Sequence, residues 1–362
     1  MGSVKDFVVE KAPTAGEMGG GKLVFSGRYS VFDWGEMPDS IPHAGASRCM
    51  TSAYFFERLN QRGERTHYVG LGDNIDHPYS SAELREPLNT MQVNLVRVVK
   101  PVATIQSGKV NYDYSFFDEA QKNGEGNFVV PGEFIYRNVL GRGSSVFRRL
   151  RDPNDPLTLE EMGLTKEPQE GQRLSPSYRD ISTKFEKFDR YLGWAVMQRL
   201  MGLSDAEKQE ALRLLDVANA EITGGVSRAG LQNDDGKKEL GFDTSRKLMV
   251  VDALGTLDEC RYTYPLNGDR IDLSKEIPRQ WYRYKQPEWV AQIDAAKKSG
   301  VEDWKSLVAI QPEPMPVALV EMLSHVYASV ANAVLQRQLF DAPPLGEVAK
   351  EYQRFRELEM KV

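Results

Sequence analysis

The sequence predicts an α+β protein with a small β-rich N-terminal lobe and a larger α+β lobe that ends in extra helices. Short β-branched and apolar runs dominate the N-terminal third. Alternating apolar and charged residues near position 240 indicate a β-hairpin. Apolar residues at helical spacing fill the C-terminal part. We place the small lobe at residues 1–132 and the larger lobe at residues 133–362.

Two strands and one helix are expected in the small lobe. The apolar runs Lys22–Phe25 and Val93–Val99 predict strands. Residues 46–59 predict a helix, because their apolar side chains recur on one helical face. Gly16–Gly21 contains four glycines and is expected to form a flexible loop.

A further strand is expected at Phe128–Leu140, beside the lobe boundary. The preceding segment, Val102–Asn127, is polar and aromatic without a clear period, so we expect a surface insertion. Beyond the strand, Asp152–Tyr178 is rich in Pro, Glu and Gly, which indicates a loop.

Three helices are expected in the larger lobe. The first begins at Ser204, with Glu207 completing a capping-box pattern, and Gly224-Gly225 is expected to end it. The second covers residues 289–298, which carry an apolar stripe followed by lysines. The third covers residues 316–339 and opens with a proline.

Composition limits the classes of function. The chain has 362 residues and a net charge of -6, and this acidic balance argues against a general nucleic-acid binder. Cys49 and Cys260 are too few for a disulfide framework or a zinc site, which fits a reducing compartment. No signal peptide is evident, and no run approaches the ~18 apolar residues of a membrane span. We therefore expect a cytoplasmic protein with no membrane or nucleic-acid partner.

Charged residues alternate along the first strand of the predicted hairpin. Asp235, Lys237 and Glu239 would share a face, since successive side chains of a strand point to opposite faces. A turn over residues 243–246 would place Asp252 opposite Lys237 on that face. Carboxylates gathered so closely repel each other unless a cation lies among them, which suggests Mg²⁺. The opposite face would be apolar and would carry Leu240, Phe242, Met249 and Val251.

The same pattern has two other interpretations. Charged alternation on a hairpin is commonly a solvated face. A pairing shifted by one residue would also separate these side chains. The spacing alone therefore leaves the function open.

Five short motifs follow one another between Arg28 and Arg261. They are Arg28-Tyr-Ser-Val-Phe-Asp33; Pro131-Gly-Glu-Phe-Ile-Tyr-Arg-Asn138 with Gly143-Ser144; Ser182-Thr-Lys-Phe-Glu186 with Asp189; Asp235-Gly-Lys-Lys-Glu-Leu-Gly241; and Val251-Asp252 with Asp258 and Arg261. In this order they resemble the SAICAR synthetase family, most closely its archaeal members. The corresponding family patterns are Arg-Ile-Ser-Ala-Tyr-Asp, Pro-Val-Glu-x-Val-Val-Arg-Asn with Gly-Ser, Ser-Thr-Lys-x-Glu, Asp-Thr-Lys-Phe-Glu-Phe-Gly, and Val-Asp-Glu with Pro-Asp-x-x-Arg.

The resemblance implies a two-lobed, ATP-grasp or kinase-like fold and one reaction. ATP, the carboxylated aminoimidazole ribotide CAIR and L-aspartate would give ADP, phosphate and SAICAR in purine biosynthesis. A carboxylate is a poor electrophile, so transfer of the γ-phosphoryl group would first make an acyl phosphate. The aspartate amine would then attack it. Catalysis of this kind is chiefly positioning and charge neutralisation.

The resemblance also implies roles on the nucleotide side. Glu239 and Asp252 would hold Mg²⁺ against the ATP phosphates. Lys237 would neutralise charge at the transferring group, and Asp235 would orient that group. ATP would also be contacted by Lys184 and Lys11.

On the substrate side, Arg137 and Ser144 would hold the CAIR phosphate. A guanidinium fork and a hydroxyl beside backbone N–H groups suit such a dianion. Arg137 could instead pair with Glu133. The remaining contacts to CAIR or aspartate would come from Ser30, Asp33, Asp258 and Arg261, with Arg261 on a carboxylate.

Two departures from the family pattern concern ATP. The opening Gly-Lys-x-Lys/Arg motif is not intact, and its nearest match is Glu10-Lys-Ala-Pro13. Gly19-Gly-Gly-Lys22 is a candidate replacement, because glycine lets the backbone approach phosphate closely. Ala253 stands where the family has an acidic residue. The basic cluster Arg148, Arg149 and Arg151 is expected to be solvated.

Two alternative functions stay open. One is a sister ATP-dependent amide ligase with a different amine or carboxylate, because a fold does not fix its substrate. The other is a non-catalytic ATP-binding relative, which the departures from the family pattern at Pro13 and Ala253 favour. The expected partners are the small molecules ATP, CAIR and L-aspartate, and the sequence leaves a homo-oligomer open.

Overall fold

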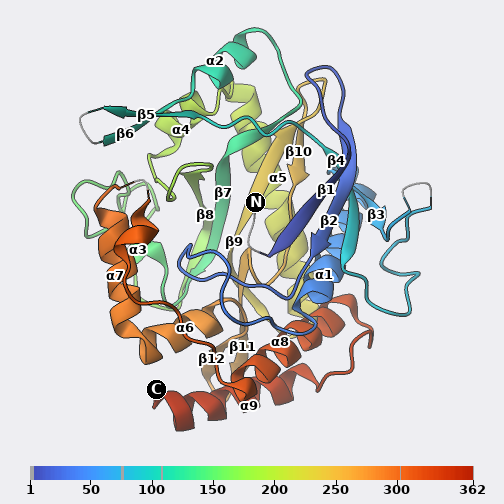
Figure 1. The fold of residues 1–362 in the computed structure, drawn as a ribbon, viewed down its shortest axis with the longest axis vertical. Helices are drawn as coiled ribbons and strands as arrows, with labels where there is room; N and C mark the ends of the chain where they lie inside the picture. Colours follow the sequence, from blue (N-terminus) through green and yellow to red (C-terminus); the bar gives the residue numbers. More distant parts are fainter. Residues whose placement is uncertain (1–3, 75–76, 107–108, 302, 362) are drawn as a thin grey trace.

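A small sheet and a large sheet lie side by side in the computed structural model, which describes residues 4–74, 77–106, 109–301 and 303–361 (Figure 1). The small sheet is antiparallel, with strand order β1-β2-β4-β3. Helix α1 (Ala44–Gln61) packs against it and confirms the predicted helix. The strands are β1 (Lys5–Lys11), β2 (Gly19–Phe25), β3 (Tyr68–Leu71) and β4 (Thr90–Leu95), so both predicted strands occur, the second ending four residues early, at Leu95 rather than Val99.

Strand β2 begins within the predicted glycine loop, so that prediction is wrong for Gly19–Gly21. A Cβ on Gly19 would lie 2.2 Å from the carbonyl oxygen of Lys11. A Cβ on Gly21 would lie 2.2 Å from the carbonyl oxygen of Val8. These glycines allow β1 to pass close to β2, which leaves no room for side chains.

The large sheet has the strand order β12-β11-β9-β7-β8, with β10 paired to β9. Its central strand β7 (Phe128–Leu140) has the predicted bounds and is buried along its whole length between β8 and β9. The proposed lobe boundary, between residues 132 and 133, falls within β7, and the extent of the lobes stays a prediction. The other strands are β8 (Gln172–Thr183), which begins inside the predicted loop, β9 (Gln232–Phe242), β10 (Leu248–Val251), β11 (Cys260–Leu266) and β12 (Asp269–Asp272).

The β9–β10 hairpin forms one residue out of the predicted register. Val251 pairs with Glu239, so Asp252 falls one position short of the place opposite Lys237, toward the turn. The cause is the turn, which spans residues 243–247 and is one residue longer than predicted.

The same shift exchanges the faces of β10. Leu248 and Val250 join Leu240 and Phe242 in the main core, contrary to the prediction. Met249 and Val251 instead pack on the opposite face in a separate apolar cluster. A shift of one residue moves every side chain of a strand to the other face, which explains the exchange.

Helix α5 (Asp205–Arg228) packs against β9 and β7 and supports the large sheet. Its capping box is confirmed, since Ser204 and Glu207 each bond to the other's backbone N–H. The prediction that Gly224-Gly225 ends the helix is wrong. A Cβ on Gly225 would lie 2.6 Å from the ring of Phe55, so this glycine allows α5 to approach α1 within the helix.

Residues 102–127 hold more structure than the predicted surface insertion. The strands β5 (Val102–Gln106) and β6 (Lys109–Asp113) form a hairpin that projects from the molecule (Figure 1). The following helix, α2 (Ser115–Lys122), is not an exposed insertion, because Phe117 is fully buried against Phe128. Apolar residues at helical spacing anchor α2, whereas the hairpin is exposed.

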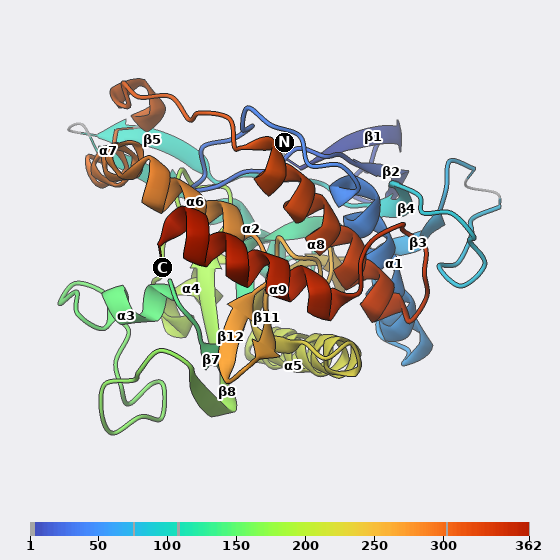
Figure 2. The same cartoon turned by 90° about the horizontal axis from the view of Figure 1, so that it is seen from below.

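The helices α8 and α9 run side by side across the near face in Figure 2, where α8 packs against α1 and α9 packs against β11 and β12. The predicted helix at residues 289–298 is confirmed as α7 (Pro287–Lys298). The predicted last helix forms α8 (Val317–Leu335) and stops at Gln336, whose φ of 55° is left-handed. The other helical elements are α3 (Ser145–Arg149), α4 (Trp194–Leu200), α6 (Glu276–Lys285), η1 (Trp304–Leu307), α9 (Leu345–Phe355) and η2 (Arg356–Met360).

By length and composition alone, helix α8 is long and apolar enough to cross a membrane. From the sequence we expected no segment of this kind. However, 67% of the helix is buried inside the protein, where it packs against α1 and α9. Its apolar character is therefore explained by the core.

Candidate active site

The two central strands present charged side chains on the face that points away from α5. β7 supplies Glu133 and Arg137, and β9 supplies Asp235, Lys237 and Glu239. In the register of the two strands, Glu133 lies opposite Glu239, and Arg137 lies opposite Asp235. All five side chains therefore share one face of the sheet. We call these five residues the charged face. The alternate side chains, Phe134, Tyr136 and Leu240, are buried in the main core.

Two lysine–carboxylate pairs occupy one end of the charged face. Lys237 Nζ lies 2.5 Å from Glu133 Oε1, and Lys184 Nζ, just after β8, lies 2.6 Å from Glu239 Oε1. Burial, and then the nearby Asp252 carboxylate, raise the pKa of Glu239. Lys184 and Lys237 act against this rise. This end therefore holds carboxylates whose mutual repulsion is only partly offset by lysines.

Asp252 joins this end from the segment after β10. Its φ of 73° is left-handed, which is uncommon for a residue with a side chain. Asp252 is also the residue whose predicted position in the hairpin is wrong. Lys5 Nζ, from β1, lies 2.8 Å from Asp252 Oδ1, and the imidazole Nε2 of His67 lies 3.1 Å from the Asp252 carbonyl oxygen. Burial alone would raise the pKa of Asp252, but Lys5 and Lys184 outweigh it and lower that pKa.

Glu239 and Asp252 are the candidate metal ligands. Within the described residues, no group of three or more His, Cys, Asp or Glu side chains could hold a metal ion. Mg²⁺ commonly binds through one or two carboxylates together with phosphate oxygens and water. The donor set therefore fits Mg²⁺ bound together with a nucleotide, and does not fit a metal cage made of protein alone.

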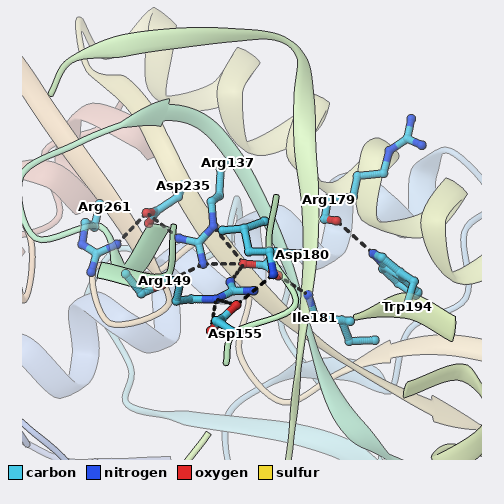
Figure 3. Close-up of polar contacts among 11 residues, drawn as sticks. Arg137, Arg149, Asp155, Arg179, Asp180, Ile181, Trp194, Asp235 and Arg261 are labelled. Carbon is cyan, nitrogen blue, oxygen red and sulfur yellow. Dashed lines mark hydrogen bonds and ion pairs between the residues drawn. The ribbon is translucent and has the colours of Figure 1, made fainter. Parts of the chain in front are cut away.

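Arginines and aspartates alternate at the other end of the charged face (Figure 3). Asp235 Oδ2 lies 2.5 Å from Arg261 Nη1 and 3.8 Å from Arg137 Nη1. Arg137 Nη2 donates to Asp180 Oδ2 at 2.8 Å, and Arg149 Nη1 donates to the same oxygen at 2.6 Å. Asp180 and Asp235 therefore hold the guanidinium group of Arg137 from both sides. Arg137 does not form the alternative ion pair with Glu133.

Arg149 is buried, so the prediction of a solvated basic cluster is wrong for this residue. Its Nε donates to Asp155 Oδ2 at 3.0 Å, and its guanidinium lies 3.9 Å from the ring centroid of Tyr191. Asp155 is only six residues away, but Asp180 of β8 and Tyr191 lie far off in the sequence, so spacing alone did not reveal this role.

Three guanidinium groups surround the fully buried carboxylate of Glu276, the first residue of α6. Arg283 Nη1 lies 2.5 Å from Oε1, while Arg279 Nη1 and Arg261 Nε lie 3.6 Å and 3.7 Å from Oε2. Arg261 also pairs with Asp235, so two carboxylates here face three guanidinium groups. Among the described residues, four buried polar atoms here lack a hydrogen-bond partner: Ser144 Oγ, Arg261 Nε, Arg279 Nε and Glu276 Oε2. Unsatisfied buried groups beside excess positive charge indicate an anion site.

Ser30 and Asp33 lie on the loop after β2, near the arginine end. Asp33 is exposed, and its Oδ2 lies 2.5 Å from Lys297 Nζ. Neighbouring protein atoms displace part of the water around this carboxylate, which would raise the pKa of Asp33, but Lys297, and then Arg279, lower it. The Ser30 hydroxyl accepts a hydrogen bond from the backbone N–H of Gly35 at 3.2 Å.

Two other predicted residues lie apart from the charged face. The Asp258 carboxylate, a predicted substrate contact, bonds to Arg48 and Tyr327. Lys11 is exposed and pairs with Glu17. The structure therefore brings together most of the predicted residues, but not these two.

The structure places Lys5, which the sequence did not single out, at the lysine–carboxylate end of the charged face. A signal was available, because Gly2-Ser-Val-Lys5 keeps the first glycine and the last cation of Gly-Lys-x-Lys/Arg. Gly2 itself lies outside the described residues. In the structure, Lys5 is buried against Asp252, whereas Lys11 is exposed.

An apolar cluster continues the charged face at its lysine–carboxylate end. Val251 of this cluster pairs with Glu239 across the hairpin and therefore shares its face. Lys184 Nζ lies 5.3 Å from the ring centroid of Phe185, which packs on the cluster. The buried members are Val96, Val129, Met249 and Val251, with Met18 and Phe185 packed against them.

Comparison with known proteins identifies the family. The family model described as SAICAR synthetase matches residues 19–296. The chain belongs to the SAICAR synthetase family. A putative phosphoribosylaminoimidazole-succinocarboxamide synthase of Archaeoglobus fulgidus is 44% identical over 354 residues, which cover 97% of this chain and 98% of that protein. The phosphoribosylaminoimidazole-succinocarboxamide synthase of Thermoplasma volcanium is 31% identical over 264 residues, covering 72% and 76%.

Solved SAICAR synthetase structures share the fold. The SAICAR-synthase from Saccharomyces cerevisiae complexed with SAICAR has a TM-score of 0.59 at 19% identity, covering 93% of this chain and 94% of that chain. A SAICAR synthetase (type-2) in complex with ADP has a TM-score of 0.52 at 16% identity, covering 87% and 99%. These likenesses confirm the predicted α+β, SAICAR synthetase-like class. The SAICAR synthetase family match ends at residue 296 and leaves out α8 and α9.

Proposed function

We propose that this chain is the cytoplasmic, ATP-dependent ligase that joins L-aspartate to CAIR and forms SAICAR, ADP and phosphate in purine biosynthesis. The observation that carries this proposal is the division of the charged face. One end holds lysine–carboxylate pairs suited to a nucleotide with Mg²⁺, and the other holds buried arginines suited to an anionic substrate. Phosphoryl transfer between two anions needs both a site for the nucleotide with Mg²⁺ and a site for the anionic substrate.

ATP binds at the lysine–carboxylate end in this proposal. The apolar cluster around Val251 takes the adenine, and Lys5 and Lys184 lie beside the phosphates. Glu239 and Asp252 hold Mg²⁺, which offsets phosphate charge when bound. Lys237 neutralises the transferring group, and its pair with Glu133 keeps the ammonium in place.

CAIR binds at the arginine end. Its phosphate accepts hydrogen bonds from Arg137 and from the unsatisfied Ser144 hydroxyl. Asp235 and Asp180 hold the Arg137 guanidinium on both sides, so its orientation is set before substrate arrives. Arg261 receives a carboxylate.

The reaction then proceeds in two transfers. An oxygen of the CAIR carboxylate attacks the γ-phosphorus, the bond to ADP breaks, and an acyl phosphate forms. The aspartate amine attacks the acyl carbon, and phosphate leaves as the amide forms. The residues act by holding the anions in line and offsetting their repulsion. Ser30 and Asp33 line the side on which aspartate enters.

Phosphate release from Mg-ATP tests the proposal, with CAIR and L-aspartate added singly and together. We expect release that requires both, with SAICAR as the product. Release that needs CAIR but is indifferent to aspartate would indicate a sister amide ligase. ATP binding without release under any combination would indicate a non-catalytic relative.

A further inference from the structure

Residues 252–261, the loop after β10 together with the first two residues of β11, connect the two ends of the proposed site. It begins with Asp252 at the lysine–carboxylate end and finishes with Arg261 at the arginine end. Any displacement of this segment would therefore move a nucleotide-side and a substrate-side residue together.

Asp258, within this segment, is bound by two residues from separate helices. Arg48 of α1 donates to both carboxylate oxygens, from Nε to Oδ2 and from Nη2 to Oδ1 at 3.4 Å. The Tyr327 hydroxyl of α8 donates to the carboxylate at 3.3 Å, and accepts from Arg48 Nη2 at 3.0 Å. The Arg48 guanidinium also lies 4.7 Å from the ring centroid of Tyr327. Arg48 is 1% exposed and Tyr327 5% exposed.

The Arg48 guanidinium is also linked, through Ser26, to the residue before β1, the strand that carries Lys5. Arg48 Nη1 donates to the carbonyl oxygen of Ser26 at 2.8 Å. The backbone N–H and the hydroxyl of Ser26 both donate to the carbonyl oxygen of Val4 at 3.0 Å, and Val4 directly precedes Lys5. One buried cation therefore ties β1 to the segment that holds Asp252.

Other contacts hold the segment along its length. Leu254 N donates to Ser52 Oγ at 2.9 Å, and Lys237 N donates to the carbonyl oxygen of Glu259 at 3.1 Å. These contacts fix the backbone. The side chain of Asp258, by contrast, is held by Arg48 of α1 and by the Tyr327 hydroxyl of α8. Helix α8 lies beyond the SAICAR synthetase family match.

We propose that Arg48 and Tyr327 are positioning residues that act through Asp258, and we call the three residues the Asp258 clamp. The clamp sets the places of Asp252 and Arg261 at once, so the C-terminal helices contribute to catalysis without touching substrate. This inference rests on the proposed function for its kinetic consequence. It also replaces the expectation that Asp258 contacts substrate.

The test is Tyr327→Phe, which removes one hydroxyl and keeps the ring over Arg48. The matched control is Ser329→Ala on the same helix, where a buried hydroxyl donates to the Pro343 carbonyl at 2.7 Å, away from the segment. We expect Tyr327→Phe to lower kcat/KM about tenfold for both ATP and CAIR, as for a lost charge-assisted hydrogen bond. Ser329→Ala should leave both values unchanged at a similar loss of thermal stability.

A second variant, Arg48→Lys, keeps the charge but cannot bond Asp258 and the Ser26 carbonyl oxygen together. We expect it to reduce kcat/KM for both substrates at least as much as Tyr327→Phe does. Kinetic values equal to those of Ser329→Ala would overturn the proposal. So would a loss confined to one substrate.

Hydrogen exchange separates this inference from the proposed function. We expect residues 252–261 to exchange faster in Tyr327→Phe than in Ser329→Ala, whichever reaction the wild type catalyses. Failure of the wild type to use CAIR would defeat the proposed function and leave this comparison in force. Equal exchange of the segment in both variants would overturn the clamp.

Discussion

Lys5 Nζ lies 2.8 Å from Asp252 Oδ1, so the first strand of the small sheet meets the large sheet at an ion pair. The Lys5 side chain is 6% exposed and that of Asp252 is 19% exposed. A pair this well shielded costs more to break than a surface pair does. The position of β1 is thereby tied to the lysine–carboxylate end of the charged face, where the proposed function places ATP.

Replacing Lys5 by alanine should weaken the use of ATP. We expect Lys5→Ala to lower kcat/KM for ATP by about 100-fold, because Asp252 loses its nearest cation and the phosphates lose a positive charge. Lys11→Ala should change it far less, since Lys11 is exposed and pairs with Glu17. Steady-state rates over a range of ATP concentrations measure both. A larger loss in Lys11→Ala would restore the original assignment.

Glu239→Gln tests the metal assignment. The amide keeps the shape of the side chain but lacks the charge that attracts Mg²⁺, so we expect kcat to fall about 100-fold or more. The far-ultraviolet circular dichroism spectrum should match that of the wild type. Mg²⁺ titration of the phosphate-release rate provides the measurement, and wild-type activity with an unaltered Mg²⁺ requirement would remove Glu239 from the metal site.

Arg137→Lys tests the phosphate assignment. Lysine keeps the charge but cannot bond Asp180 and a phosphate with one planar fork. We expect the KM for CAIR to rise about tenfold, with the KM for ATP little changed. Kinetics with each substrate varied in turn would distinguish the two. An unaltered KM for CAIR would place its phosphate elsewhere.

His67 should make stability depend on pH. Burial lowers the pKa of its imidazole to about 4, below the unfolded value of about 6.5, so the unfolded chain takes up the proton first as the pH falls. Wild-type stability is then lost as the pH falls from about 6.5 to about 4. Relative to His67→Gln, the free energy of unfolding should fall by about 2 kcal/mol between about pH 7.5 and pH 5. Urea unfolding at both pH values measures it, and parallel pH dependences would exclude His67 as the cause.

The elements predicted best were those whose local signals agree with the tertiary structure. Strand β7 is mostly apolar and is buried along its whole length, and α5 begins at a complete capping box. The hairpin register failed because it depends on the turn, where Arg246 adopts a left-handed φ of 54° that the sequence does not reveal. Gly225 was taken for a helix end because its contact with Phe55 is tertiary.

The site was predictable where one strand carries it. Asp235, Lys237 and Glu239 share a face because strand geometry requires it, whatever the register of the partner. The surroundings of Glu276 were predictable only in part. Arg279 and Arg283 follow Glu276 on α6 at helical spacing, whereas Arg261 belongs to β11 and meets them only in the folded chain.

Strand β7 carries Glu133 and Arg137 four residues apart, one at each end of the charged face. Since a strand rises by about 3.3 Å per residue, their Cα atoms are separated by about 13 Å. Neighbours on both sides prevent β7 from stretching or sliding. In the proposed function, β7 would therefore fix the distance between the groups that bind the phosphate and those beside the reacting carboxylate, and a molecule of another length would reach only one end at a time.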